Sequence, residues 1–310
     1  MRKPATDLRK GTQVSGKRLL VLVNPRSGKR RGLIVLEKVK PVFAAAGIDL
    51  EVRVTERPGH ARQVAKTFDL TGYRGLCLVG GDGTVHEAVG GLVERGAAAS
   101  IPLGIIAAGT GNTLLDHLGL AEPMEAARRI VAGRTCPIDV ARIEARDGVD
   151  YCVVLVGWGG IADINVTAEK LRWMGPPRYA AGALWNILTA KPRAARLVLD
   201  GRTIEDKFLF VIACNSRYAG SKMDLAPRAE IADGKIDVVL VRTATRPQML
   251  RLFAKVFDGS HVTMPCVEYY QVRSLAIDSE GDDVLDLDGE IKGAPPISLK
   301  VLPRAVQVFA

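Results

Sequence analysis

Short apolar runs alternate with segments of helical spacing in the first part of the chain, and this alternation constrains the fold more than any other feature. The apolar runs are rich in Leu, Val and Ile and lie at residues 18–23, 50–54, 75–79 and 101–106. The segments of helical spacing lie at residues 30–46, 59–68, 84–93, 111–118 and 124–131. Short strands that alternate with helices of this length predict a parallel sheet with right-handed crossovers.

The sequence changes character after Pro137. Runs typical of β-strands follow at residues 138–143, 151–156, 195–199, 207–213, 236–241, 267–277, 284–287 and 297–302, and two helical segments interrupt them at residues 163–191 and 246–257. We therefore predict an α/β chain with two domains. A parallel-sheet, three-layer domain occupies residues 18–137 after a flexible basic leader at residues 1–17, and an antiparallel β-sandwich with helical insertions occupies residues 138–310. The last strand is free to return to the first domain.

Charge and composition narrow the class of partner. The net charge is +9 and the pI is about 9.4, which favours anionic partners such as nucleotide phosphates or acidic lipid surfaces. Aromatic residues are only 5% and do not interleave with basic residues, so nucleic acid is not expected. Five widely spaced cysteines lie mostly in apolar runs, which predicts buried reduced thiols and a cytoplasmic protein. No apolar stretch approaches about 18 residues, so we expect any membrane contact to be peripheral.

The sharpest local motif is Gly80-Gly81-Asp82-Gly83-Thr84, between a predicted strand and a predicted helix. A strand that turns into a helix at glycines exposes backbone N–H groups at the positive end of the helix, where they can hold phosphate oxygens. A carboxylate at this position indicates chemistry, because Asp82 can bind Mg²⁺ or accept a proton from an attacking hydroxyl. The alternative is a structural turn in which Asp82 caps a helix.

A second glycine loop, residues 107–112, follows the next strand and contains Gly109, Thr110 and Asn112. Because parallel strands end at one edge of a sheet, the two loops are expected to face one pocket. Neither loop has the third glycine of the dinucleotide fingerprint, so a Rossmann dehydrogenase is disfavoured.

Two further segments carry polar groups at predicted strand ends. After the first strand, Asn24-Pro25-Arg26-Ser27-Gly28-Lys29 offers an amide for a base or ribose and positive charge for phosphate, although by itself it is an ordinary strand-to-helix loop. Near the C-terminus, Asp286-Leu287-Asp288-Gly289-Glu290 supplies carboxylates for a general base or a metal, or else forms a solvated acidic turn.

The ordered combination of these segments resembles the diacylglycerol kinase catalytic-domain family, which includes bacterial soluble lipid kinases, sphingosine kinases and ceramide kinases. The resemblance spans about residues 18 to 303. Besides the motifs above, it rests on Thr55 with Gly59-His60-Ala61, Tyr218-Ala219-Gly220, Ala226-Pro227-Arg228-Ala229 and Asp233-Gly234-Lys235-Ile236-Asp237.

The resemblance implies ATP-dependent phosphorylation of a lipid hydroxyl in a cleft between a nucleotide domain and a β-sandwich domain. The matching residues imply a nucleotide site formed by Asn24 to Gly28, Thr55, Gly80 to Thr84, Glu87, Gly109, Thr110, Asn112 and Gly289. The proton acceptor is expected at Asp288 and Glu290 jointly, with Asp82 as a rival base or as a ligand of a magnesium-bound water. A structural Mg²⁺ is expected at Asp233, with backbone carbonyls near Glu230 and Lys235.

The sequence departs from the family where many members have an acid after Gly-Thr-Gly-Asn and this chain has Thr113. The departure leaves ATP binding intact but leaves the acceptor open among diacylglycerol, phosphatidylglycerol and sphingosine-like lipids. The segment 163–191, with Trp173 and Trp185 among basic residues, is a candidate lipid gate at the inner membrane face, or else completes the sandwich core.

Two other functions remain open, and the sequence is also compatible with a homodimer. An NAD kinase shares the Gly-Gly-Asp-Gly-Thr loop, but it uses an Asn-Glu pair in its later loop where this chain has Asn112-Thr113. A non-catalytic lipid or nucleotide sensor would retain the glycine loops, although the presence of Asp82, Asp288 and Glu290 favours an enzyme.

Overall fold

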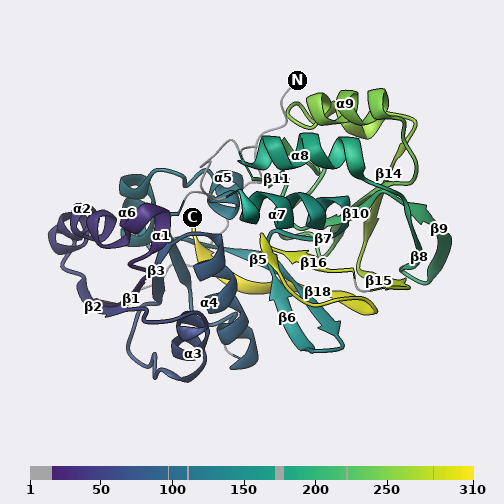
Figure 1. The fold of residues 1–310 in the computed structure, drawn as a ribbon. Helices are drawn as coiled ribbons and strands as arrows, with labels where there is room; N and C mark the ends of the chain where they lie inside the picture. Colours follow the sequence, from purple (N-terminus) through teal and green to yellow (C-terminus); the bar gives the residue numbers. More distant parts are fainter. Residues whose placement is uncertain (1–15, 97, 110–111, 172–177, 221–222, 282) are drawn as a thin grey trace. The chain divides into compact units, whose positions relative to one another are not determined.

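The computed structural model describes residues 16–310, except residues 97, 110–111, 172–177, 221–222 and 282. The predicted basic leader therefore lies almost wholly outside the described residues. The chain divides into two compact units (Figure 1). Unit 1 contains the residues up to Val140 together with Pro303–Ala310, and unit 2 contains Ala141–Leu302.

Unit 1 is a three-layer α/β unit. Its strands are β1 (Arg18–Val23), β2 (Asp49–Val54), β3 (Leu76–Gly80), β4 (Leu103–Ala107), the start of β5 (Thr135–Ala145) and the end of β18 (Ile297–Phe309). Its helices are α1 (Ser27–Arg30), α2 (Gly32–Ala45), α3 (His60–Thr67), α4 (Asp82–Glu94), α5 (Thr113–Leu118) and α6 (Pro123–Ala132). The strands lie in the order β2, β1, β3, β4, β18, and the pairs along this order are parallel.

Alternation along the strands of unit 1 explains its layers. On β1, Leu19, Val21 and Val23 pack in one apolar cluster with α2 and α6. The intervening Leu20 and Leu22 are also buried, which requires cover on the opposite face. Helices α3 and α4 supply this cover, with α4 packed on β3 and α3 packed on α4 (Figure 1). The predicted parallel sheet with helices on both faces is confirmed.

Unit 2 is an antiparallel β-sandwich, also as predicted. One sheet contains the end of β5, β6 (Gly148–Cys152), the start of β18, β15 (Ser274–Ser279), β8 (Arg193–Leu199) and β9 (Arg202–Phe208). The other sheet contains β14 (Val267–Val272), β13 (Ile236–Val241), β10 (Phe210–Cys214), β7 (Leu155–Gly159), β16 (Leu285–Leu287) and β17 (Glu290–Ile291), in that order. A short ribbon of β11 (Tyr218–Ala219) and β12 (Met223–Asp224) stands apart. One buried cluster joins side chains of both sheets, including Trp158, Leu240 and Leu299.

Three runs that the sequence predicts as single strands are each divided in two, and this is a correction. Residues 207–213 divide at Leu209, and residues 267–277 divide at Arg273; in both, the chain passes from one sheet of the sandwich to the other. The Arg273 N–H donates to the Asp200 carboxylate at the second of these corners. Residues 151–156 also divide where the chain passes between the sheets, at Val153 and Val154, whose backbone N–H groups donate to a side chain.

Three helices form a separate layer of unit 2. Helix α7 (Gly160–Lys170) packs on the second sheet, α8 (Arg178–Thr189) packs on α7, and α9 (Arg246–Lys255) packs on α8 (Figure 1). The short 3₁₀ helix η2 (Ser260–Thr263) follows α9. Among the described residues, no helix has both the length and the apolar character needed to cross a bilayer. Residue Trp173 of the predicted lipid gate lies outside the described residues.

Candidate active site

The loops that follow β1, β3 and β4 in unit 1 contact one another. The carbonyl oxygen of Gly80 accepts hydrogen bonds from the N–H groups of Ala108 (2.8 Å) and Gly109 (3.1 Å). Asn24 donates from Nδ2 to the Thr84 hydroxyl at 3.1 Å. The structure therefore brings the three glycine-containing segments together at the carboxyl edge of the parallel strands.

The first loop has a backbone that favours glycine. Gly28 has φ of +52°, and a Cβ atom built on it would lie 2.0 Å from the carbonyl oxygen of Ala108. The loop begins with a local turn, in which the Asn24 Oδ1 accepts the N–H of Arg26 at 3.0 Å. Arg26 and Lys29 are exposed on it, whereas Ser27 is buried. Pro25 lies between Asn24 and Arg26 in this turn.

The Asp82 carboxylate joins the loop after β3 to the loop after β4. The Asp82 Oδ1 and Oδ2 accept the backbone N–H of Thr113 at 3.0 and 3.1 Å. Thr113 is the first residue of α5, so Asp82 caps the neighbouring helix and not its own helix α4, which begins at Asp82 after Gly81. The carboxylate thereby ties the two loops together. In the first turn of α4 the Thr84 N–H already donates to the Gly81 carbonyl at 2.9 Å, so the positive end of the helix lies at Asp82 and Gly83.

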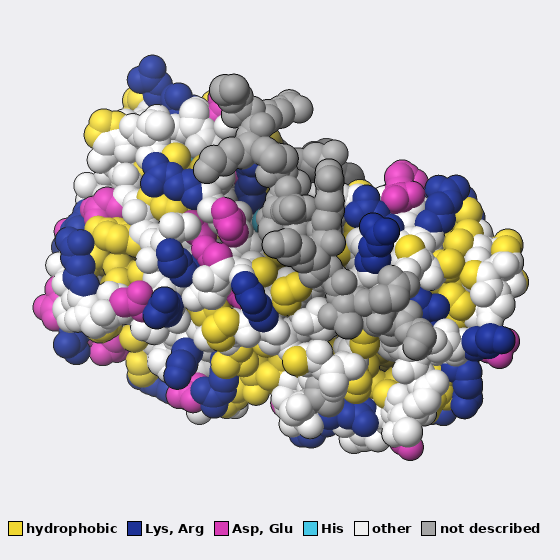
Figure 2. Space-filling view, turned by 180° about the vertical axis from the view of Figure 1, so that it is seen from behind, with side chains coloured by type: hydrophobic (Ala, Val, Ile, Leu, Met, Phe, Trp, Pro, Cys, Tyr) yellow, Lys and Arg dark blue, Asp and Glu magenta, His cyan; other side chains and the backbone are white. Residues whose placement is uncertain are grey.

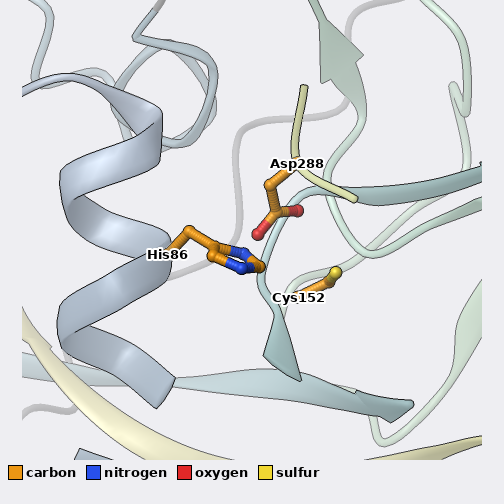
Figure 3. Close-up of side chains that lie close together, drawn as sticks. All are labelled: His86, Cys152 and Asp288. Carbon is orange, nitrogen blue, oxygen red and sulfur yellow. The ribbon is translucent and has the colours of Figure 1, made fainter. Parts of the chain in front are cut away.

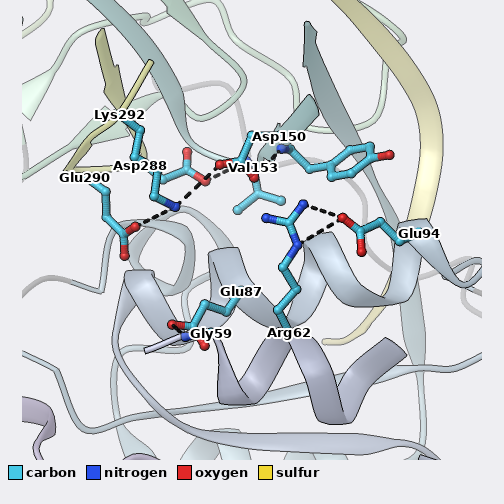
Figure 4. Close-up of polar contacts among 10 residues, drawn as sticks. Gly59, Arg62, Glu87, Glu94, Asp150, Val153, Asp288, Glu290 and Lys292 are labelled. Atoms are coloured by element: carbon cyan, nitrogen blue, oxygen red, sulfur yellow. Dashed lines mark hydrogen bonds and ion pairs between the residues drawn. The ribbon is translucent and has the colours of Figure 1, made fainter. Parts of the chain in front are cut away.

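Two other predicted nucleotide residues have structural contacts at or near this edge. Thr55 donates its N–H to the Val23 carbonyl at 2.9 Å, just beyond the end of β2. Glu87 on α4 accepts the N–H groups of Gly59 (2.8 Å) and Ala61 (3.1 Å) and so caps α3 (Figure 4). Thr110 lies outside the described residues.

Asn112 holds a buried oxygen beside this edge. Its Nδ2 donates to the Gly109 carbonyl at 3.2 Å. Its Oδ1 is buried and has no hydrogen-bond partner among the residues that the structure describes. A buried acceptor without a donor is costly, so a ligand donor at this position would be stabilising.

In unit 2, Asp288 is buried at a turn between β16 and β17. Its carboxylate accepts the backbone N–H groups of Val153 (3.0 Å), Val154 (2.8 Å) and Leu155 (3.0 Å), as Figure 4 shows in part. These bonds hold the backbone where the predicted strand at residues 151–156 divides. Asp288 has φ of +54° and Gly289 has φ of +91°, so the turn is tight and held by the carboxylate itself.

A buried thiol lies close to this carboxylate. Figure 3 shows the side chains of Cys152 and Asp288, both of unit 2 and both buried. Burial raises the pKa of the Cys152 thiol well above its ordinary value, and the negative charge of Asp288 raises it further. Cys152 is therefore a neutral packing residue at physiological pH, as are the buried thiols of Cys77 and Cys214.

Glu290 differs from Asp288 in its surroundings. It is half-buried, and its carboxylate lies 2.7 Å from the Lys292 Nζ, which also approaches Asp150 at 3.4 Å (Figure 4). The predicted magnesium segment forms a turn in which the Lys235 N–H donates to the Asp233 Oδ1 at 2.9 Å. Asp233 and Glu230 are exposed.

Two further residues help to shape this turn: Asp286, which belongs to the acidic motif but has no role assigned from the sequence, and Asn165 of α7, which the sequence does not indicate. The Asp286 Oδ1 accepts the Gly289 N–H at 2.7 Å, and the Asn165 Nδ2 donates to the Gly289 carbonyl at 2.9 Å. Asp286 and Asn165 together hold Gly289, which lies between the two acids Asp288 and Glu290. Burial raises the pKa of Asp286 to about 7, with a smaller contribution from the charge of Asp288. Because side chains alternate along a strand, Leu285 and Leu287 predict that Asp286 faces away from the sandwich core. The sequence gives no signal that α7 covers Asp286.

Replacing Gly28 by Ala is expected to lower the free energy of unfolding by about 2 kcal/mol or more, because the substitution combines positive φ with a clash against Ala108. Gly47 is a matched control, since it has φ of +64° and no atom within 4 Å of a built Cβ. Gly47→Ala is expected to cost about 1 kcal/mol. Urea unfolding measures both variants, and equal losses would contradict the proposed contact between the loops.

Asp288→Asn is expected to destabilise the protein by about 1–3 kcal/mol, because an amide cannot accept at both positions and leaves one buried N–H of residues 153–155 unpaired. Glu290→Gln, at a half-buried position, is expected to change stability by less than about 0.5 kcal/mol. Urea unfolding compares the two. An Asp288→Asn variant as stable as the Glu290→Gln variant would show that these backbone bonds contribute little.

Asp286→Asn is expected to remove a pH dependence of stability. Between about pH 4 and pH 7 the folded protein keeps a proton on Asp286 that the unfolded chain releases, so the free energy of unfolding falls as pH rises through this window. The rise from 3.8 to about 7 corresponds to at most about 4 kcal/mol. Asn keeps the acceptor for Gly289 and carries no charge.

The advantage of Asp286→Asn over the native protein should therefore grow from pH 4.5 to pH 7 and stay constant above it, as measured by urea unfolding. Asp278→Asn, at an exposed position of β15, is the control and should show no such trend. A constant difference between Asp286→Asn and the native protein across this range would show that Asp286 is ionised in the fold.

Comparison with protein families gives two matches that together cover most of the chain. Residues 18–143 match the diacylglycerol kinase catalytic domain. Residues 153–310 match the YegS C-terminal NAD kinase beta sandwich-like domain.

Named relatives and a solved structure match most of the chain in a single alignment. Sphingosine kinase 1 of Arabidopsis thaliana is 30% identical over 94% of this chain and 72% of its own length. A diacylglycerol kinase of Mycobacterium tuberculosis is 30% identical over 94% of each chain. The crystal structure of a candidate diacylglycerol kinase from Bacillus anthracis shares the fold, with a TM-score of 0.80 and 23% identity over 97% of each chain. The chain therefore belongs to the lipid kinase family that is defined by the diacylglycerol kinase catalytic domain.

Proposed function

We propose that this protein transfers the γ-phosphoryl group of ATP to the hydroxyl of a diacylglycerol-, phosphatidylglycerol- or sphingosine-like lipid. The observation that carries the proposal is the convergence of three glycine-containing loops at one edge of the parallel sheet of unit 1. Phosphoryl transfer asks a protein mainly for positioning and for compensation of negative charge, and such an edge can supply both.

Unit 1 is proposed to bind the nucleotide. The phosphates are assigned to the N-terminus of α4, a helix of 13 residues that begins just after Gly81. Exposed Arg26 and Lys29 add positive charge on the neighbouring loop. The Asn112 Oδ1 is proposed to accept a donor of the base or ribose, which would satisfy this buried oxygen.

Mg²⁺ is proposed as the metal of the reaction, where it would neutralise charge on the phosphates. A second, structural Mg²⁺ is proposed at the turn that holds Asp233. The turn supports this proposal because its Asp233 carboxylate is exposed and Mg²⁺ prefers oxygen ligands, and the family resemblance adds the carbonyls near Glu230 and Lys235.

The acidic residues are proposed to divide the remaining work. Asp288 accepts three backbone N–H groups and holds the turn, and Glu290 is the half-buried carboxylate that would accept the proton of the lipid hydroxyl. Lys292, paired with Glu290, orients that carboxylate. Asp82 remains the rival base, although its carboxylate caps α5.

The test is transfer of label from γ-labelled ATP to diacylglycerol, phosphatidylglycerol, sphingosine, ceramide and NAD, each in mixed micelles with Mg²⁺. The native protein is expected to label one of the lipids and to lose this activity when Mg²⁺ is chelated. Glu290→Gln is expected to lower kcat by about 10²-fold or more without raising the KM for ATP, because the general base acts only on the acceptor.

Matched variants separate the alternatives. Glu280→Gln, at an exposed acid of a nearby turn, is the control and should keep full activity. Asp82→Asn tests the rival base; if it loses kcat while Glu290→Gln does not, the assignment moves to Asp82. Labelling of NAD alone would establish an NAD kinase in place of a lipid kinase. ATP binding without transfer to any acceptor would establish a sensor.

We also propose that the protein works in the cytoplasm and contacts the inner face of the membrane peripherally, because its substrate class resides in a bilayer. The net charge of +9 supports contact with an anionic membrane surface. Figure 2 shows Lys and Arg side chains, in dark blue, spread among hydrophobic side chains, in yellow, over the face that it displays.

A further inference from the structure

Large hydrophobic side chains are exposed at nine described positions, and four of these positions are on two helices of unit 2 that pack on each other. These four are Leu184 and Trp185 of α8, and Leu250 and Phe257 on and just after α9. Trp185 is 60% exposed and Phe257 is 52% exposed. They are the only aromatic residues among the nine.

Helix α9 carries two apolar stripes where a surface helix needs one. Met249, Leu252 and Val256 are buried and pack toward the protein. Leu250, Ala254 and Phe257 are exposed and recur at helical spacing on the outer side. The inner stripe accounts for the packing of α9, so the outer stripe is not needed for the fold.

The outer stripe has a defined shape. The rings of Phe253 and Phe257 meet edge to face, with centroids 5.7 Å apart, so that Phe257 is held against the helix. Arg246, at the start of α9, donates to the carbonyl oxygens of Ile187 (2.7 Å) and Ala190 (3.1 Å) at the end of α8. Arg246 thereby ties the start of α9 to the end of α8, and the two helices pack on each other. We call the exposed residues of these two helices the α8–α9 surface.

The charges of the α8–α9 surface are of one sign. Residues 181–191 and 246–257 contain Lys191, Arg246, Arg251 and Lys255 and no Asp or Glu. Arg251 and Lys191 are exposed. The nearest acid in sequence is Asp258, which directly follows residues 246–257. Aromatic and aliphatic side chains flanked by Lys and Arg suit the boundary between lipid headgroups and acyl chains of an anionic bilayer.

We propose that the α8–α9 surface docks on an anionic lipid bilayer. The inference rests on the proposed function in one respect, since a lipid substrate gives the docking its purpose. The proposal adds α9 to residues 163–191, the candidate lipid gate of the sequence. It assigns Leu250 and Phe257 to insertion into the bilayer and Arg251 to contact with the headgroups. Apolar burial and charge then act together, and neither is sufficient alone.

The experiment is sedimentation of the full chain, without ATP, with vesicles of phosphatidylglycerol and phosphatidylcholine, and with vesicles of phosphatidylcholine alone. The native protein is expected to bind the anionic vesicles and to bind the neutral ones weakly, with an affinity that falls as salt is added. The double variant Leu250→Ser/Phe257→Ser is expected to bind the anionic vesicles at least about tenfold more weakly. Arg251→Gln is expected to bind them about fivefold more weakly.

The chain supplies matched controls on unit 1. Leu33 and Ile34 of α2 are 45% and 67% exposed, so Leu33→Ser/Ile34→Ser removes a similar exposed apolar area. Lys38→Gln removes a charge from an exposed position of the same helix. Both controls are expected to bind like the native protein. Phe257→Trp, which keeps an interfacial aromatic ring, is expected to keep binding and guards against loss through misfolding.

Several outcomes would overturn the proposal. Equal loss in the Leu250/Phe257 and Leu33/Ile34 variants would show that exposed apolar area in general, and not this surface, drives binding. A concentration-dependent dimer in analytical ultracentrifugation that Leu250→Ser/Phe257→Ser abolishes, with vesicle binding unchanged, would assign the surface to a second copy of the chain. The vesicle assay contains no ATP and measures only binding. If the protein binds anionic vesicles but labels no lipid in the γ-labelled ATP assay, the proposed function is refuted and the docking surface stands.

Discussion

The hydrogen bonds between the loops that follow β3 and β4 are the constraint on which the site of unit 1 depends. Parallel pairing of these two strands brings their ends to one edge, but it does not fix the loops beyond them. The Gly80 carbonyl, which accepts from Ala108 and Gly109, and the Asp82 carboxylate, which accepts from Thr113, supply that fixation. With the loops tied in this way, the N–H groups at the start of α4 are held in place before any ligand arrives, which reduces the cost of ordering on binding.

A carboxylate plays a comparable structural part in unit 2. Asp288 collects three backbone N–H groups from residues 153–155, and Asp286 with Asn165 holds the next residue, Gly289. Two acids thus shape a turn that presents a third, Glu290. In both units, residues that the sequence marks as chemical are also structural, so loss of activity on their substitution has two explanations. Stability measurements on the same variants are needed to separate them.

The sequence predicts much of the fold because local patterns determine it. Strand and helix periods place the elements of unit 1, and glycine loops mark the ends of its strands. What it missed depends on contacts between distant residues. The backbone at residues 153–155 is held by Asp288, more than 130 positions away, and the Asp82 carboxylate accepts the N–H of Thr113 at the start of α5. Likewise, the polar position of Asp286 is visible in the sequence, but its cover by α7 and its raised pKa are not.

The central claim is that the loops after β1, β3 and β4 together bind a nucleotide phosphate, and hydrogen exchange of the backbone amides tests it most directly. Addition of ATP and Mg²⁺ should slow exchange at residues 24–28, 80–87 and 107–113 together, and should leave α8 and α9 unchanged. Slowed exchange confined to a different part of unit 1, or no change at these three loops at a saturating nucleotide concentration, would contradict the account.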